Sequence, residues 1–363
     1  MGMILTRRYN VDRFGYLIPH RYGNLPMVGA VATYRPGEGR FGGAVAVEEG
    51  TENKIATPTT FAGWAILSGG AVLDNDGSFY PSQAKFARVT TTVWDFQSNS
   101  IPAANGQTWS VSYIARRGTG DGEPRAAIMI MNASNTHVSN IDPTFSSRNI
   151  GGGWVRYEAT FTINYADTGY IRLRFYVTAT NGGYHDFALP QLEPKPFATS
   201  FVDGSREEGF LAFPMPVDKN TGTISLWIQP QTSYIPSGAT SWIGRIDLSW
   251  GRSNPNSGFV IQREQQDSIQ LRIWDGVSGT NIRRSINWDA GDWIHCAITW
   301  DSPSISFFVN GEFVGVLDRE IDPDDRLVIG GASFGGSYNP GNALYDELLI
   351  LPYAASEEEI QRW

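Results

Sequence analysis

The sequence contains a single cysteine, Cys296, which lies in the apolar segment "WIHCAITW". One thiol excludes an intrachain disulfide and a zinc site built from cysteines. The apolar neighbours predict that this side chain is a small buried hydrophobic group. The sequence also lacks any apolar run of about 18 residues, and its N-terminal segment lacks the apolar core of a secretory signal. We therefore expect synthesis in the cytoplasm without membrane insertion.

Positive charge is scarce as well. Lys and Arg total 28 against 37 Asp and Glu, and the formal net charge at pH 7 is −9. Binding dominated by nucleic-acid phosphates depends on clustered Lys and Arg side chains that displace counterions. The composition excludes a partner of that kind and favours a neutral or weakly charged ligand.

The sequence is rich in aromatic and turn-forming residues. Aromatics make up 13% of the 363 residues, and there are 40 Gly and 20 Pro. This mixture is typical of many short strands joined by turns. The length allows about two to three domains at roughly 150 residues each. We expect an all-β protein with two β-sandwich domains.

Local patterns are clearest after residue 201. Three segments alternate so that one face is apolar: Ile224, Leu226 and Ile228; Ile269, Leu271 and Ile273; and Ile294, Cys296 and Ile298. This period of two predicts sandwich strands. Asn310-Gly311 between two alternating runs predicts a type I′ hairpin. Near the end, Ser356 and Glu359 form the sequence of a capping box, which predicts a short terminal helix.

Three segments in this half, "TGTISLWIQP", "DWIHCAITWDSPSISFFVNGEFVG" and "NALYDELLILPYAASEEEI", resemble in order the laminin-G-like, concanavalin A-like jelly roll. The resemblance covers about 160 residues. It implies that a first strand lies beside the last one, and "GRFGGAVAVEEG" fits that role. We expect residues 39–47 to pair near residues 343–351, in the sandwich that also contains residues 223–228.

The residues between these parts then form an insertion, which a sandwich tolerates at a surface loop. They contain further strand patterns and resemble the jelly rolls of carbohydrate-binding modules. The closing "FALPQLEPKPFATSFV" is similar to the end of such modules in bacteriophage virion proteins, and "VEEGTENKIATPTTFAGW" is similar to their start. The expected domains are an N-terminal arm (1–38), a concanavalin A-like domain (39–54 and 201–363) and an inserted jelly roll (55–200).

Catalytic motifs are not found. The hydrolases of the resembled family carry Glu-x-Asp-x-x-Glu on one strand, because glycoside hydrolysis needs two carboxylates around the scissile bond. The nearest segment is "EIDPDD", with Glu320, Asp322 and Asp325, which contains a proline and ends in Asp. The four histidines, His20, His137, His185 and His295, have no metal-ligand spacing. We expect no enzymatic activity and no required cofactor.

Calcium is a possible ligand, because both resembled families often bind it through oxygen atoms in loops. The candidate ligands are Asp74, Asp76 and Asp186 in the insertion and Asp346 in the last strand. The alternative is that these side chains form local turn hydrogen bonds. Asp346 could equally accept structural hydrogen bonds inside the sandwich.

A candidate carbohydrate surface comes from "YIRLRFYVTA". Alternation sends Tyr170, Arg172, Arg174 and Tyr176 to one face. Sugar sites combine flat aromatic faces with planar polar groups, so this stripe fits such a site. Trp64 and Trp94 are candidates to join it. The alternative is an ordinary exposed sheet face or a contact with a neighbouring subunit.

Together, these patterns favour a non-enzymatic bacteriophage virion component of the tail, a fibre or the capsid surface. Its expected partners are other virion proteins, further copies of itself and a host-surface glycan. The alternatives are a lectin module that accompanies a polysaccharide-acting enzyme, and a bacterial surface adhesin. The N-terminal arm is rich in Tyr, Phe and Arg, which are typical of interface anchors, and we expect it to dock on a partner. The alternative is an extension that lies on the protein's own surface.

Overall fold

The computed structural model describes residues 3–4, 32–35, 39–41, 44–48, 50–66, 71–73, 84–90, 96–119, 122–177, 183–206, 211–215, 217–231, 245–251, 258–264, 268–274, 278–323, 326–331 and 341–363. Strands form almost all of the regular structure in these ranges, and α1 (Glu357–Ile360) is a single short helix at the end. The expected all-β sandwich class is confirmed. In the part described, no helix is long and apolar enough to cross a membrane.

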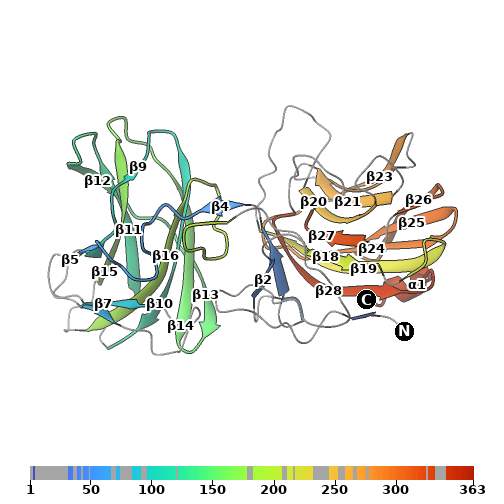
Figure 1. The fold of residues 1–363 in the computed structure, drawn as a ribbon, viewed down its shortest axis with the longest axis horizontal. Helices are drawn as coiled ribbons and strands as arrows, with labels where there is room; N and C mark the ends of the chain where they lie inside the picture. The colour runs from blue at the N-terminus through green and yellow to red at the C-terminus, as the bar shows by residue number, and fades with distance from the viewer. Residues whose placement is uncertain are drawn as a thin grey trace. The chain divides into compact units, whose positions relative to one another are not determined.

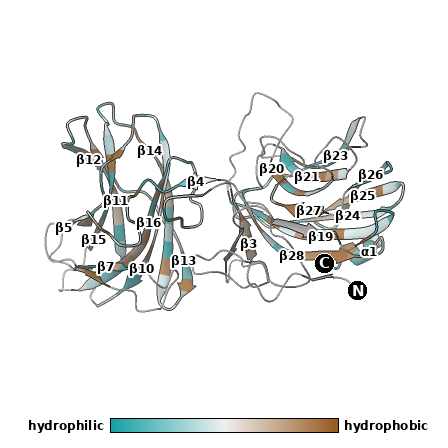
Figure 2. Ribbon diagram, viewed as in Figure 1, coloured by the Kyte–Doolittle hydropathy of each residue, from teal (hydrophilic) through white to brown (hydrophobic). Residues whose placement is uncertain are grey.

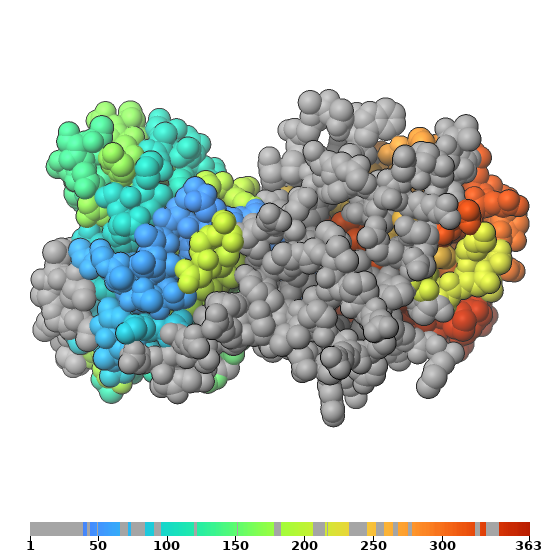
Figure 3. Space-filling view, viewed as in Figure 1, coloured from blue at the N-terminus to red at the C-terminus, as the bar shows by residue number. Residues whose placement is uncertain are grey.

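The chain divides into two compact units. The flanking unit consists of Met1–Gly50 and Glu207–Trp363, and the inserted unit of Thr51–Arg206. The sequence placed the limits of the insertion at 55 and 200. The difference comes from β4 (Thr51–Glu52) and β17 (Ser205–Arg206), which pair with each other but are too short to give a periodic signal. Figure 3 shows the start (blue) and the end (yellow-green) of the inserted unit side by side.

Two antiparallel sheets form the described flanking unit (Figure 1). The β19 sheet has the order β2-β3-β28-β19-β24-β25-β26, with β1 also beside β28. Its strands are β1 (Met3–Ile4), β2 (Ala32–Arg35), β3 (Ala44–Val47), β19 (Thr221–Pro230), β24 (Ile294–Asp301), β25 (Ser304–Val309), β26 (Glu312–Asp318) and β28 (Ala343–Leu351). The β22 sheet has the order β18-β27-β20-β21-β22-β23. Its strands are β18 (Leu211–Pro214), β20 (Arg245–Trp250), β21 (Gly258–Glu264), β22 (Ser268–Trp274), β23 (Gly279–Ser285) and β27 (Arg326–Ile329).

The core of the flanking unit contains the predicted apolar faces. All nine residues predicted from β19, β22 and β24 are buried in one cluster, Cys296 among them. Side chains of successive strand residues point to opposite faces, so the residues between these nine face away from the core. In Figure 2 hydrophobic and hydrophilic residues are mixed along the strands, as this alternation requires. The predictions for these strands and for Cys296 are confirmed.

The strand that the sequence predicted as the first of the sandwich, β3, pairs with the last strand, β28. Val47 lies opposite Ala343 and Val45 opposite Tyr345, so β3 pairs with β28 across nearly 300 residues of sequence. The expected pairing of the first and last strands is confirmed. Two stretches of the expected N-terminal arm also belong to this sheet, since β1 pairs with β28 and β2 with β3. Each of these two short strands therefore has one hydrogen-bonded neighbour within the described chain.

Both local signals of the flanking unit are confirmed. Asn310 and Gly311, with φ of 52° and 78°, join β25 to β26 through the positive-φ pair of a type I′ turn. Near residue 360, the Ser356 hydroxyl caps α1 by accepting from the Glu359 amide, and the Glu359 carboxylate accepts from the Ser356 amide at 2.8 Å.

The described inserted unit contains two larger sheets and the β4–β17 pair. The β16 sheet has the order β13-β14-β10-β16-β7-β6, and the β15 sheet has the order β12-β11-β15-β8-β5 with β9 also beside β15. The strands of the first are β6 (Ala71–Leu73), β7 (Phe86–Thr90), β10 (Thr108–Arg117), β13 (Ser146–Gly151), β14 (Trp154–Thr162) and β16 (Tyr184–Glu193). Those of the second are β5 (Ala65–Ile66), β8 (Phe96–Gln97), β9 (Ile101–Pro102), β11 (Pro124–Met131), β12 (His137–Ile141) and β15 (Tyr170–Val177). Their facing apolar residues form a separate core rich in aromatic rings.

Candidate functional site

The predicted stripe lies in the middle of the β15 sheet. Strand β15 is bordered by β11 on one side and by β8 and β9 on the other. Ile171, Leu173 and Phe175 are fully buried against the core. The four alternating residues, Tyr170, Arg172, Arg174 and Tyr176, are half-buried on the outer face. The sequence therefore placed all four on the correct face.

The Arg172 side chain has defined polar partners. The Arg172 guanidinium donates from Nε to Ser100 Oγ at 2.9 Å and from Nη1 to Gln97 Oε1 at 3.1 Å. Ser100 Oγ in turn donates to Asn135 Oδ1 at 2.9 Å. An arginine held through two of its nitrogen atoms keeps a fixed orientation on the sheet, with further N–H donors on the same planar group.

The other end of the stripe pairs an arginine with a tyrosine. The Arg174 Cζ atom lies 5.4 Å from the centre of the Tyr176 ring, within the range of a cation–π contact. The Tyr176 hydroxyl donates to Asp142 Oδ1 at 3.2 Å. Burial, followed by the charge of Asp142, raises the pKa of Tyr176. The phenol therefore stays protonated at neutral pH and remains a hydrogen-bond donor.

The neighbouring strands widen this face with residues that the sequence reasoning missed. Across β11, Arg125 lies opposite Tyr176, Met129 opposite Arg172 and Met131 opposite Tyr170. Beyond Met129, Asn140 follows on β12. Residues directly opposite in a sheet share a face, so the exposed Arg125 and Asn140 extend the stripe, whereas Met129 and Met131, which are 8% and 4% exposed, are buried beside it. The alternation in "RAAIMIMNA" was the available signal, but only the register of β11 against β15 shows which residues become neighbours.

Trp64 does not join the stripe. It is 7% exposed and stacks on Phe96 and Phe175 with ring centres 4.9 Å and 5.7 Å away. Phe175 faces the core, so Trp64 lies on the side of β15 opposite to the tyrosines and arginines. Its assignment to the sugar surface was wrong, because the ring fills the sandwich interior. Trp94 lies outside the described residues.

Asp186 has the wrong partners for a calcium ligand. This carboxylate is 1% exposed and accepts hydrogen bonds from Arg88 Nε at 2.8 Å and Arg116 Nη2 at 3.0 Å. The two guanidiniums rest on aromatic rings, since Arg88 Cζ lies 3.9 Å from the Tyr184 ring centre and Arg116 Cζ lies 4.7 Å from that of Trp154. Both carboxylate oxygens are engaged by cations, so the residue neutralises arginines and does not fit a bound divalent cation.

Asp346 accepts backbone hydrogen bonds, as the structural alternative required. Its Oδ2 accepts from the Phe41 amide at 3.0 Å and its Oδ1 from the Glu347 amide at 2.9 Å. Within the described ranges, no three His, Cys, Asp or Glu side chains gather as a metal site. Asp74 and Asp76 lie outside those ranges. The residues that the structure places therefore do not fit the expected calcium sites.

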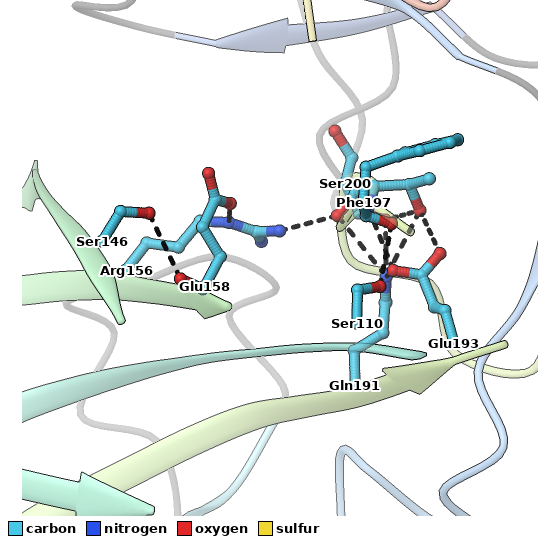
Figure 4. Close-up of polar contacts among 9 residues, drawn as sticks. Ser110, Ser146, Arg156, Glu158, Gln191, Glu193, Phe197 and Ser200 are labelled. Carbon is cyan, nitrogen blue, oxygen red and sulfur yellow. Dashed lines mark hydrogen bonds and ion pairs between the residues drawn. The ribbon is translucent and has the colours of Figure 1, made fainter. Parts of the chain in front are cut away.

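The segments that resemble phage modules meet in a buried polar network on the β16 sheet (Figure 4). The Glu193 carboxylate accepts from the Thr199 amide at 2.9 Å, the Thr199 hydroxyl at 2.7 Å and Gln191 Nε2 at 2.8 Å. Arg156 donates from Nη2 to the Thr199 carbonyl at 2.6 Å, and Gln191 Oε1 accepts from the Val202 amide at 2.7 Å. These contacts give the "QLE" and "ATS" residues a structural role in fixing the chain that follows β16.

Asn53 joins the start of the inserted unit to this network. Its Nδ2 donates to the carbonyls of Pro190 at 3.0 Å and Val202 at 3.1 Å. Its Oδ1 accepts from the amides of Ile55 at 3.1 Å and Leu192 at 3.2 Å. All four hydrogen-bonding positions of one buried amide are therefore used to hold the two ends of the inserted unit together.

The acidic segment after β26 is exposed. Glu320 and Asp322 both face solvent, and Asp322 Oδ1 accepts from Lys219 Nζ at 2.6 Å. Asp325 lies outside the described residues. His137 Nε2 lies 3.1 Å from Asn140 Oδ1, and His295 Nε2 lies 2.7 Å from Ser225 Oγ. His295 is therefore held by a side-chain hydrogen bond within its own sheet.

Comparison with known proteins identifies the fold of one unit. Residues 206–361 match the laminin-G model described as the Concanavalin A-like lectin/glucanases superfamily. Apart from Arg206 this region lies in the flanking unit, so the expected concanavalin A-like lectin domain is present there. A search of curated protein sequences gave no match.

Solved structures that match part of the chain include a heptameric SAP-like pentraxin from Limulus polyphemus, with 17% identity, a TM-score of 0.30 and coverage of 39% of this chain and 68% of that one. A CBM40 of the Ruminococcus gnavus IT-sialidase bound to α2,3 sialyllactose has 17% identity, a TM-score of 0.32 and coverage of 39% and 82%. The binding domain of botulinum neurotoxin DC in complex with rat synaptotagmin II has 13% identity and a TM-score of 0.34. The match covers 46% of this chain and 41% of the toxin chain.

Proposed function

We propose that the protein binds glycans without chemical conversion, and that the outer face of β15 is its binding surface. The observation that carries this proposal is the alternation of β15, which leaves two tyrosines and two arginines together on an outer sheet face. The lectin family match of residues 206–361 supports a glycan-binding role for the chain.

The chemistry of the surface suits a sugar. Tyrosine rings contact the C–H face of a pyranose, and a guanidinium presents paired donors to hydroxyls or to a carboxylate. Because Arg172 is held by Ser100 and Gln97, its side chain loses little further freedom on binding. Such pre-organisation favours recognition of a polar ligand on an open sheet face.

The non-enzymatic part of the proposal rests on the carboxylates. The sequence has no Glu-x-Asp-x-x-Glu strand motif, and the nearest acidic segment is exposed with Asp322 paired to Lys219. A retaining glycosidase needs two carboxyl groups about 5 Å apart on either side of the bond. Purified protein is expected to release no reducing ends from polysaccharide. Release that is lost in Glu320→Gln or Asp322→Asn would overturn this part.

The surface is tested by glycan-array screening followed by calorimetric titration of the best ligand. We expect Arg174→Ala and Tyr170→Ala each to weaken binding by roughly tenfold, because each removes one contact group. Tyr353→Ala and Arg362→Ala are matched controls, since both residues are exposed and lie near the C-terminus. Unchanged affinity in both β15 variants would reject this surface. We expect a chelator to leave the affinity unchanged.

The proposed setting is a virion, in which the protein adheres to host glycans as one of several tethered copies. The support is the resemblance of "FALPQLEPKPFATSFV" to the ends of phage virion modules. Several linked copies raise a weak affinity by about 10² to 10⁴ without new contacts. In the alternative settings, an enzyme-associated module or a cell-surface adhesin, the chain would be absent from particles. Immunogold labelling of purified particles separates these outcomes, and a variant lacking Met1 to Pro26 tests whether the N-terminal segment is needed for incorporation.

A further inference from the structure

The outer face of the β22 sheet carries an exposed tryptophan. Trp274, the last residue of β22, is 38% exposed, although Leu271 and Ile273 of the same strand are buried in the core. In contrast, Trp250, Trp288 and Trp300 of the same unit are each at most 3% exposed. Exposure of a large apolar ring beside polar residues often marks a binding surface.

The strands on both sides of Trp274 present glycines to it. Gly258 of β21 and Gly279 of β23 lie directly opposite Trp274 in the sheet. A Cβ atom on Gly279 would lie only 2.9 Å from Cε3 and 3.0 Å from Cζ3 of the indole. The ring therefore lies over the Gly279 backbone, in a position that any larger residue would obstruct. Because Gly258 and Gly279 have no side chains, neither places an atom beyond its backbone next to the indole ring.

Polar side chains continue this face next to the ring. The Arg272 Cζ atom lies 5.9 Å from the ring centre, and Asn281 lies opposite Arg272 across the β22–β23 pair. Asn281 Nδ2 donates to Gln270 Oε1 at 2.7 Å, which fixes the orientation of the amide. Arg283 lies opposite Gln270. The strands β22 and β23 contain arginines and no carboxylate, although the whole chain carries a net charge of −9.

We propose that Trp274, Arg272 and Asn281 form a second glycan-binding site, on the flanking unit, which takes a sugar bearing a carboxylate. The indole contacts the C–H face of the pyranose, as aromatic rings do with flat apolar surfaces. The Arg272 guanidinium pairs with the sugar carboxylate, for which its planar donor pairs are suited. Asn281 contributes an amide at the same edge, next to Arg272. The site is independent of β15 in position, and it rests on the proposed function only for the class of ligand.

The test uses the full chain labelled with 5-fluorotryptophan. The probes are trigalacturonate, a trimer of α2,8-linked sialic acid and a mannuronate trimer, with maltotriose as the neutral comparison. The fluorine resonance of Trp274, assigned by its absence in Trp274→Phe, is expected to shift with at least one acidic probe. Trp274→Ala is expected to weaken calorimetric binding of that probe by roughly tenfold. Phe313→Ala removes an exposed ring from the other sheet of the same unit and is the matched control. It should leave the affinity for the acidic probe unchanged.

Arg272→Gln separates recognition of the carboxylate from stacking. We expect this substitution to lower the affinity for the acidic probe by roughly tenfold and to leave any affinity for maltotriose unchanged. A Trp274 resonance that none of the acidic probes shifts overturns the proposal. The proposal is also overturned if Trp274→Ala and the unmodified protein bind the acidic probe with equal affinity. If Trp274→Ala instead abolishes co-purification with a protein partner while all glycan affinities persist, the surface is a protein interface and the proposal is also wrong.

Arg174→Ala distinguishes this site from the one on β15. If only Arg174→Ala loses binding of the acidic probe, the result supports the β15 surface and rejects the Trp274 site. If only Trp274→Ala loses it, the result supports the Trp274 site and rejects the β15 surface. Partial loss in each variant, and larger loss in the double variant, supports both.

Discussion

At the scale of single residues, His295 has one of the most perturbed environments in the described chain. The ring is 2% exposed, lies 4.9 Å from the Trp227 ring centre, and has its Nε2 within 2.7 Å of Ser225 Oγ. Above Trp227, the Arg40 guanidinium lies 3.8 Å from the indole centre. Burial, followed by the charge of Arg40, lowers the pKa of His295 to about 4. The imidazole is therefore neutral at physiological pH.

This titration gives a pH dependence of stability with a defined sign. The unfolded chain protonates the imidazole below about pH 6.5, whereas the folded chain resists protonation down to about pH 4. The contribution of His295 to stability is thus complete above pH 6.5 and is lost as the pH falls toward 4, by about 3 kcal/mol in total. Urea unfolding at several pH values, followed by hydrogen exchange in the β24 peptide, measures it. The curve for His295→Gln should be flatter in this window, and parallel curves for the two proteins would contradict the assignment.

Sequence reasoning at this scale succeeded where a residue belongs to a regular strand. Alternation alone placed Arg172 and Arg174 on the outer face of β15 and Cys296 in the core. It failed for Trp64, because this residue follows a turn in which Thr57 and Phe61 have positive φ, and no period indicates where its ring points. Asp186 was misread for a related reason, since its two arginine partners are brought to it by β7 and β10 from distant sequence.

At the scale of elements, signals confined to a few neighbouring residues were sufficient to predict a turn and a helix start. The Asn310-Gly311 hairpin and the Ser356 capping box are determined by local backbone geometry, so they could be predicted. The extent of the candidate surface could not be predicted, because Arg125 and Asn140 join it through the register of β15, β11 and β12. Register depends on the packing of the whole face and is not encoded in one segment.

The polar network that joins the first and last segments of the inserted unit makes a testable contribution to its stability. Replacing Asn53 by Ala leaves the Pro190 and Val202 carbonyls and the Leu192 amide without this side-chain partner in a buried site. We expect a loss of about 3 kcal/mol, since each buried unsatisfied group costs about 1–3 kcal/mol. Calorimetry should show one transition lowered on the order of 10 °C. The exposed Asn149, replaced by Ala, is the control, and equal melting of the two variants would refute the role of Asn53.

At the scale of the whole molecule, the sequence predicted the pairing of β3 with β28 but not the final limits of the insertion. The pairing followed from the resemblance of about 160 residues to the laminin-G-like family, which implies that the first strand lies beside the last. The limits depend on β4 and β17, whose two residues each cannot show a period. A two-residue strand is recognised only by the strand with which it pairs, and β4 and β17 are about 150 residues apart in sequence.

The division into two cores predicts that each unit folds without the other. Residues 51–206, produced alone, should unfold cooperatively, because their core and closing network are complete within that range. Joining Gly50 to Glu207 through a short Gly-Ser linker should preserve the flanking unit, since β3 and β28 are both retained. Circular dichroism and two-dimensional NMR spectra of both products measure the result. Dispersed spectra are expected, and collapse of either product would show that the units depend on each other.

The pairing of β4 with β17 also has a mechanical consequence. Thr51 lies opposite Arg206, so the chain enters and leaves the inserted unit at neighbouring points, through two covalent connections. A single linker permits free swivelling about its bonds, whereas two adjacent linkers resist twisting. If β15 holds a glycan, as proposed, a load on that glycan would be divided between the two connections. Two parallel covalent paths would then oppose twisting as well as stretching at the entrance of the inserted unit.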